Sequence, residues 1–222
     1  MATPPPQTTN APRSRAFIRS FLAYLLGVIF RPLTTFQKLL ADRQRLTYGW
    51  SALLLIGVLY TLVTSLLWIH HNPVSLEPFL RIPTEQYYYW LQFFCLAVYV
   101  TSGILAAAIM HLLSKVFHGQ GSFEDTLALV GMGTAAATLA TLIPDVITSV
   151  LAVMGVMADA LARPPGFWQI VTWGYLALYV LLFVVLYPAA VRAVQKIQVW
   201  QAVLVGVFGF LVYQSFLLLF IR

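Results

Sequence analysis

Few side chains in this sequence have the types and spacing that catalysis requires. Ser102 and His111 are a nucleophile and a base, but nine residues separate them, which is about 13 Å along a single helix, so they cannot pair. The sequence contains no phosphate-binding P-loop, no H-E-x-x-H motif and no paired carboxylates. We therefore predict that the protein is not an enzyme and has no catalytic residues.

Histidine and cysteine offer little for a metal or a cofactor. His70 and His71 are adjacent, so their side chains point in different directions, and the nearby Glu77 and Glu85 are weak additional ligands. The single cysteine, Cys95, lies in an apolar run and can form neither an intrachain disulfide nor a Cys-based zinc site. We expect no metal site and no cofactor.

Asp145 is an acidic residue within a long apolar stretch, and a carboxylate inside a membrane is a functional candidate because it costs about 2.5–3.5 kcal/mol at the bilayer centre. It directly follows Pro144, about 27 Å along a helix from Thr126, near the far interface. There it can cap the start of a following helix. We favour this structural role, with a proton or cation site as the alternative.

A polar turn at residues 116–129 (VFHGQGSFEDTLAL) is the most informative local stretch. Gly119 and Gly121 flank a tight turn, and Ser122 stands three residues before Asp125, which is the spacing of a capping box. Ser122 would accept the amide of Asp125, and Asp125 would bond back to the amide of Ser122. We predict that this turn, with Phe123, is structural; a docking site for a partner is the alternative.

The elements that carry these residues are transmembrane helices. Of the 222 residues, 60% are apolar and 9% are charged, where a soluble domain carries roughly 25% charged residues, so a soluble globule is excluded. A span needs about 20 mostly apolar residues, and five segments qualify. We predict an all-α, polytopic bundle of five transmembrane helices over residues 48–222, with spans at 48–69, 90–113, 126–144, 167–187 and 199–221.

Charge predicts the orientation of the bundle. Ten of the thirteen Lys and Arg residues fall on one side of the predicted spans, and only Arg81, Arg163 and Arg222 fall on the other. The positive-inside rule then puts the N-terminus in the cytoplasm and the C-terminus outside, in a multi-pass protein of the cell (cytoplasmic) membrane. The net charge of +6 does not indicate nucleic-acid binding, because the basic residues sit beside spans and meet lipid headgroups.

The residues before the first span are predicted to form a tail and interfacial helices. Residues 1–12 are rich in Pro and Thr and are predicted to form a disordered cytoplasmic tail. Residues 13–47 are predicted to form interfacial amphipathic helices, the second of which begins at Pro32 and places Leu33, Phe36, Leu39 and Leu40 on one face. The apolar run 17–30 is not a secretory signal, because no A-x-A-like cleavage site follows it.

The third apolar segment is too long for one straight span. From Thr126 it continues to Met157, about 48 Å as a helix, so we expect a bend at Pro144. Residues 144–159 then form an outer interfacial helix, or a re-entrant segment. Pairs of small residues spaced by four, such as Gly131 with Ala135 and Ala202 with Gly206, favour close helix packing within the bundle, with subunit contact as the alternative.

The pattern G-x-G-S-F-x-D-T-L at 119–127 and the upstream stretch R-P-L-T-T-F-Q-K-L at 31–39 resemble the Yip (Ypt-interacting protein) domain family, over roughly residues 30–220. The resemblance implies a non-enzymatic membrane protein with five spans and a cytoplasmic N-terminus. Eukaryotic relatives bind prenylated Rab-type GTPases, but they carry longer N-terminal domains than the roughly 47 residues here, and this chain is similar to the short prokaryotic type. The GTPase role is therefore not transferred.

The hypothesis we favour is an interaction protein that organises membrane partners or is an accessory subunit of a larger complex. Its expected partners are the lipid bilayer and other membrane proteins, with no nucleic acid and no known small-molecule substrate. The alternative is a transporter or channel for a small ion, a proton or a lipid. The spans contain few of the buried polar groups that transport requires, chiefly Gln92, Gln214 and Asp145.

Overall fold

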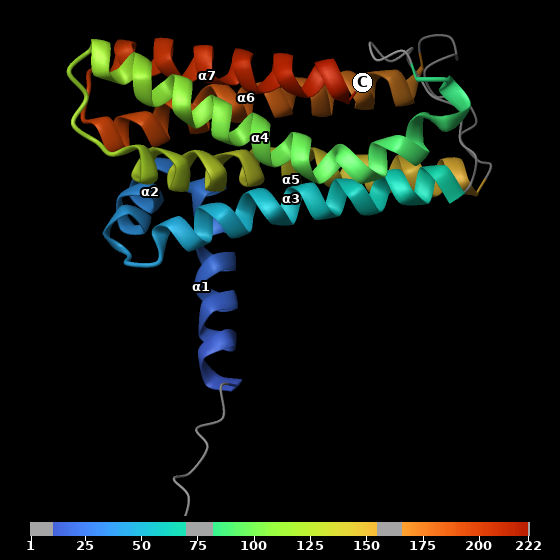
Figure 1. Ribbon diagram of the computed structural model, residues 1–222, viewed down its shortest axis with the longest axis horizontal. Helices are drawn as coiled ribbons and strands as arrows, with labels where there is room; N and C mark the ends of the chain where they lie inside the picture. Colours follow the sequence, from blue (N-terminus) through green and yellow to red (C-terminus); the bar gives the residue numbers. More distant parts are fainter. Residues whose placement is uncertain (1–10, 70–81, 155–165, 222) are drawn as a thin grey trace, which may run out of the picture.

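The structure is a computed structural model that describes residues 11–69, 82–154 and 166–221. These ranges are helical, and five helices that are long and apolar enough to cross a membrane run alongside one another (Figure 1): α3 (Arg45–Ile69), α4 (Tyr87–Val116), α5 (Phe123–Val153), α6 (Phe167–Gln195) and α7 (Val199–Phe220). Two N-terminal helices, α1 (Ala11–Phe30) and α2 (Pro32–Ala41), and the short 3-10 helix η1 (Thr84–Gln86) accompany them. The predicted all-α bundle with five candidate spans and an N-terminal helical segment is confirmed.

Several of these helices are longer than the spans predicted for them. Helix α4 runs from Tyr87 to Val116, where the sequence predicted a span over 90–113, and α6 continues to Gln195 beyond Pro188. Hydropathy marks only the apolar part of a helix. The backbone continues further because a peptide group without a hydrogen bond in hydrocarbon costs several kcal/mol, whatever side chain it carries.

The separate outer helix expected to begin at Pro144 is wrong over residues 144–153. Pro144 lies inside α5, which continues without interruption to Val153. Proline removes one backbone hydrogen bond, and α5 keeps its helical backbone on both sides of it although the candidate span ends at this residue. The remainder of the predicted outer helix, 155–159, lies outside the described residues.

Helix α5 occupies the middle of the bundle. In its membrane window 83% of the residues are buried, against 33–44% in the other four candidate spans. The contact with α3 is made backbone to backbone: a Cβ atom on Gly49 would lie 2.5 Å from the Cα of Ala128, and one on Gly131 would lie 2.6 Å from the carbonyl oxygen of Gly49. Small residues therefore do pack helices together within the bundle, as their spacing indicated.

Helix α2 begins at Pro32 as predicted, but its apolar face meets protein rather than lipid. Phe36 and Leu39 are fully buried, and α2 packs against α5 and α6. Thr35 is also buried, beside Gly27 of α1. The hydrophobic side of α2 thus fastens the N-terminal segment to the bundle.

Charge separates the two ends of the bundle. We call the end where α3 begins, α4 meets α5 and α6 meets α7 the basic end. Every Lys and Arg whose side chain the structure describes lies there or on α1: Arg15, Arg19, Arg31, Lys38, Arg43, Arg45, Lys115, Arg192 and Lys196. The last residues of α7 lie at the opposite end (Figure 1).

The close α3–α5 contact gives a prediction. Gly49→Ala should lower the free energy of unfolding by about 1–3 kcal/mol, because the added methyl group meets backbone that cannot rotate away. The measurement is thermal unfolding of the purified protein in detergent. Gly174→Ala is the matched control, since nothing lies within 4 Å of a Cβ atom there. Equal stability of both variants would disprove this account of the contact.

Candidate functional site

The predicted site residues Gly119, Gly121, Ser122, Phe123 and Asp125 come together in the turn from α4 to α5, at the basic end. Helix α4 ends in two nested hydrogen bonds. The amide of Gly119 donates to the carbonyl of Ser114 (2.8 Å), and the amide of His118 donates to the carbonyl of Lys115 (3.0 Å). His118 adopts a left-handed conformation with φ 61°. This is a Schellman motif with histidine in the position that glycine usually occupies.

Gln195, at the end of α6, holds this turn from the inside. Its side chain is only 1% exposed. Its Oε1 accepts the amide of Gly121 (3.0 Å), its Nε2 donates to Oγ1 of Thr126 (2.9 Å), and its backbone carbonyl accepts the amide of Gln120 (3.2 Å). His111 Nδ1 lies 3.4 Å from the same Nε2. One buried amide thus ties together α4, the turn, α5 and α6.

Lys115 holds the turn from the outside. Its Nζ donates to the carbonyl oxygens of Gly119 (3.0 Å) and Gly121 (2.9 Å). The two glycines are required by the close approach of neighbours, because a Cβ atom on Gly119 would lie 2.6 Å from Gln195 Oε1 and one on Gly121 would lie 2.8 Å from the carbonyl oxygen of Val194. The sequence predicted a tight turn at these two glycines, but it did not reveal the close neighbours that require them.

At the start of α5, one of the two hydrogen bonds of the predicted capping box forms. Oγ of Ser122 accepts the amide of Asp125 (3.1 Å). The carboxylate of Asp125 instead pairs with Nε of Arg45, at the start of α3. An ionised partner on another helix competes well for this carboxylate, since charge-assisted bonds are stronger than neutral ones.

Arg45 continues this set of contacts to the N-terminal helices. Its Nη1 reaches the carbonyl oxygen of Asp42 (3.5 Å), and the Asp42 carboxylate accepts the amide of Gln44 (2.8 Å) and the hydroxyl of Tyr24 on α1 (3.0 Å). Burial, followed by the hydrogen bond to Asp42, raises the pKa of Tyr24 to about 12, so its hydroxyl stays protonated and remains a donor at neutral pH.

Pro144 and Asp145 do not belong to this site. They lie 21 and 22 residues after Phe123 on α5, so about 32 Å separates them from the turn. The backbone at Asp145 is helical, and its side chain lies outside the part of the chain that the structure describes. The predicted set thus divides into five residues at the basic end and two towards the other end.

Ser102, the possible nucleophile, lies in the interior of the bundle. The hydroxyl of Ser102 is buried and bonds to the carbonyl oxygens of Val98 (2.8 Å) and Tyr99 (3.0 Å) of its own helix. Among the described residues, no group of three His, Cys, Asp or Glu could hold a metal ion. His70, His71 and Glu77 lie outside the described residues.

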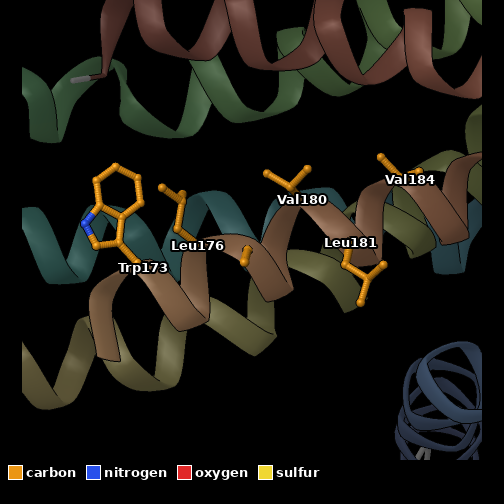
Figure 2. Close-up of a pocket in the computed structure, with 6 residues that line it drawn as sticks. Trp173, Leu176, Val180, Leu181 and Val184 are labelled. Carbon is orange, nitrogen blue, oxygen red and sulfur yellow. The ribbon is translucent and has the colours of Figure 1, made fainter. Parts of the chain in front are cut away.

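An open depression of about 510 Å³ lies along α6 (Figure 2), and its lining is apolar: Trp173, Leu176, Ala177, Val180, Leu181 and Val184. Substrate sites combine apolar walls with a few convergent polar groups, and no charged side chain lines this depression. It has the character of a surface that faces lipid.

Sequence reasoning missed Gln195, Arg45 and Asp42 as parts of the site. A glutamine at the end of an otherwise apolar span was a usable signal for Gln195. Arg45 and Asp125 are 80 residues apart, and no local pattern pairs them.

The Gln195 contacts give a second prediction. Gln195→Ala should cost about 1–3 kcal/mol, because it leaves the Gly121 amide and the Thr126 hydroxyl buried and unpaired. Thermal unfolding in detergent measures the change. The control is Gln37→Ala, an exposed position on α2, which should stay within about 0.5 kcal/mol of the wild type. A matching loss in both variants would refute the role given to Gln195.

His118 gives a third prediction. His118→Gly should raise stability by about 0.5–1 kcal/mol, because glycine adopts the left-handed conformation without the penalty of a Cβ atom. Chemical denaturation of the two proteins compares them. His118→Ala retains a Cβ atom and should bring no gain; a gain as large as that of glycine would show that relief of strain is not the cause.

Compared with known protein families, residues 26–221 match the Yip1 domain. Searches among curated proteins and among solved structures found no match. The match begins within α1 and includes α2, the polar turn and the five candidate spans. Proteins of this family are generally non-enzymatic membrane proteins. The chain belongs to the Yip1 domain family.

Proposed function

We propose that this protein is a non-enzymatic membrane scaffold, which organises other membrane proteins or serves as an accessory subunit of a larger complex, and that the α4–α5 turn is its docking surface. The proposal rests on one observation: hydrogen bonds hold the backbone of the turn in place, while its outer side chains are exposed. Gln195 and Lys115 hold its backbone, while Ser122, Phe123 and Glu124 remain exposed.

A surface that is already ordered loses little conformational entropy when a partner binds. Phe123 suits an anchoring role, because it is a large apolar side chain, 37% exposed, that contacts His111 edge to face at 5.9 Å between ring centroids. Aromatic anchors of this kind supply much of the binding free energy of interfaces.

The orientation belongs to the same proposal. The exposed cations of the basic end favour the cytoplasmic side of a cell membrane, which leaves the C-terminus outside. The partner is then a protein that presents its complementary surface at the cytoplasmic face.

Transport of a small ion, proton or lipid is the second candidate, and it rests on hydroxyl groups inside the bundle. Thr134 and Tyr187 bond to each other (2.8 Å), whereas the buried hydroxyls of Thr138 and Tyr213 interact with each other but fall short of hydrogen-bond geometry with any described residue. Water entering the bundle would satisfy both groups.

The docking proposal predicts the effect of Phe123→Ala. Loss of the anchor should reduce the amount of partner that co-purifies with the tagged protein in mild detergent by about tenfold, the effect of a hot-spot side chain worth 1.4 kcal/mol. The measurement is native mass with identification of the bound protein. Phe208→Ala, a more exposed phenylalanine on α7, is the matched control and should retain the partner.

Two outcomes contradict the docking proposal. One is a wild-type protein that is a monomer or homo-oligomer without any partner. The other is equal loss of partner from both phenylalanine variants. If the protein without a partner also conducts ions in vesicles, and Tyr213→Phe abolishes the flux, transport replaces scaffolding as the function.

A further inference from the structure

Helix α1 leaves one face of large apolar side chains uncovered. Ile18, Leu22, Leu26 and Phe30 are spaced by four residues and are 55%, 48%, 56% and 79% exposed. We call these four residues the α1 stripe. A different face of α1 already packs against the rest of the protein, because Phe21, Leu25 and Val28 are buried in the core. The stripe therefore lies on a face that the bundle does not use.

The direction of α1 determines what the stripe can meet. In Figure 1, α1 runs across the bundle and projects away from it near the basic end, whereas the five long helices run along the bundle. If the long helices cross a bilayer, a helix that runs across them lies along the membrane plane. Such a helix is placed to lie within one leaflet, with its apolar face in the boundary between headgroups and acyl chains.

The charged side chains beside the α1 stripe indicate which lipid headgroups it would meet. Arg15 and Arg19 are exposed, within one turn of Ile18 and Leu22, and α1 contains no Asp or Glu. Nearby carboxylates are engaged elsewhere, since Asp42 accepts from Tyr24 and Asp125 pairs with Arg45. The long arginine side chains can extend from the apolar boundary to the headgroups. Cationic charge at this level attracts anionic headgroups.

We propose that α1 lies in the leaflet at the basic end and binds anionic phospholipids through Arg15 and Arg19, with the α1 stripe inserted beside the acyl chains. A second copy of α1 is a poorer occupant of the stripe. It would bring two more arginines and no acidic residue, so like charges would meet where two copies pack.

The first test measures the depth of α1 in the membrane. An environment-sensitive fluorophore is attached to Leu22→Cys or to Ala16→Cys in full-length protein that also carries Cys95→Ala, reconstituted in vesicles of phosphatidylcholine and phosphatidylglycerol. Ala16 is exposed and points about 120° around the helix from Leu22. The Leu22 probe should show blue-shifted emission and resist aqueous iodide, and the Ala16 probe should be quenched. Equal quenching of both probes overturns the proposal.

The same probes distinguish lipid from a second copy of the chain. Protection of the Leu22 probe by lipid is unchanged when the protein is diluted in excess vesicles. Protection that disappears on dilution would show that another copy covers the stripe, and the proposal would be wrong.

The second test measures lipid selectivity. Native mass spectrometry of the full chain, titrated with phosphatidylglycerol or phosphatidylcholine, gives the ratio of their apparent affinities. The double variant Arg15→Gln/Arg19→Gln should lower this ratio by about fivefold or more, the effect of one basic residue near an anionic surface. The matched control, Arg192→Gln/Lys196→Asn, removes two exposed cations of the same end but not of α1, and should leave the ratio within about twofold of the wild type. An equal loss in both variants would show that lipid charge is sensed by the whole basic end, which overturns the assignment to α1.

Discussion

The structure depends on how closely α5 can approach its neighbours. In lipid there is no hydrophobic drive for helices to associate, so van der Waals contact and hydrogen bonds must supply the association. Gly49 and Gly131 allow the α3 and α5 backbones to touch, and Gly206 allows the same for α7 against Pro188 of α6. A central helix that is mostly buried follows from these contacts, and the other four spans keep one face for lipid.

Polar contacts act at the basic end, where water can reach the backbone. There Gln195 and Lys115 satisfy the amides and carbonyls that a turn between two helices would otherwise leave unpaired. Arg45, Asp125 and Asp42 extend the contacts to α1 through Tyr24. The bundle is thus held by close packing at membrane depth and by a polar network at one end.

The sequence was sufficient for the fold class because five long apolar runs in lipid have few alternatives to helices. It was sufficient for the start of α2 at Pro32 and for the bond from the Asp125 amide to Ser122, because both depend on neighbours within one turn. It failed for residues 144–153, which continue α5 rather than form a separate helix, because a proline removes only local backbone bonds and need not end a helix. It also assigned Asp125 to its own helix, because a pairing with Arg45 depends on how α3 and α5 cross and has no local signature.

The two proposed surfaces lie at the same end of the bundle for one physical reason. A charged side chain has a low free-energy cost only where water and lipid headgroups solvate it. The basic residues therefore gather at one interface. Helix α1 can lie in that interface because α2 attaches it to the bundle through Phe36 and Leu39. The α4–α5 turn is exposed at the same end, and Gln195 holds its backbone there. If both proposals hold, a protein partner at the turn docks beside the lipid in which α1 lies, and the lipid composition of that leaflet becomes part of the surface that the partner meets.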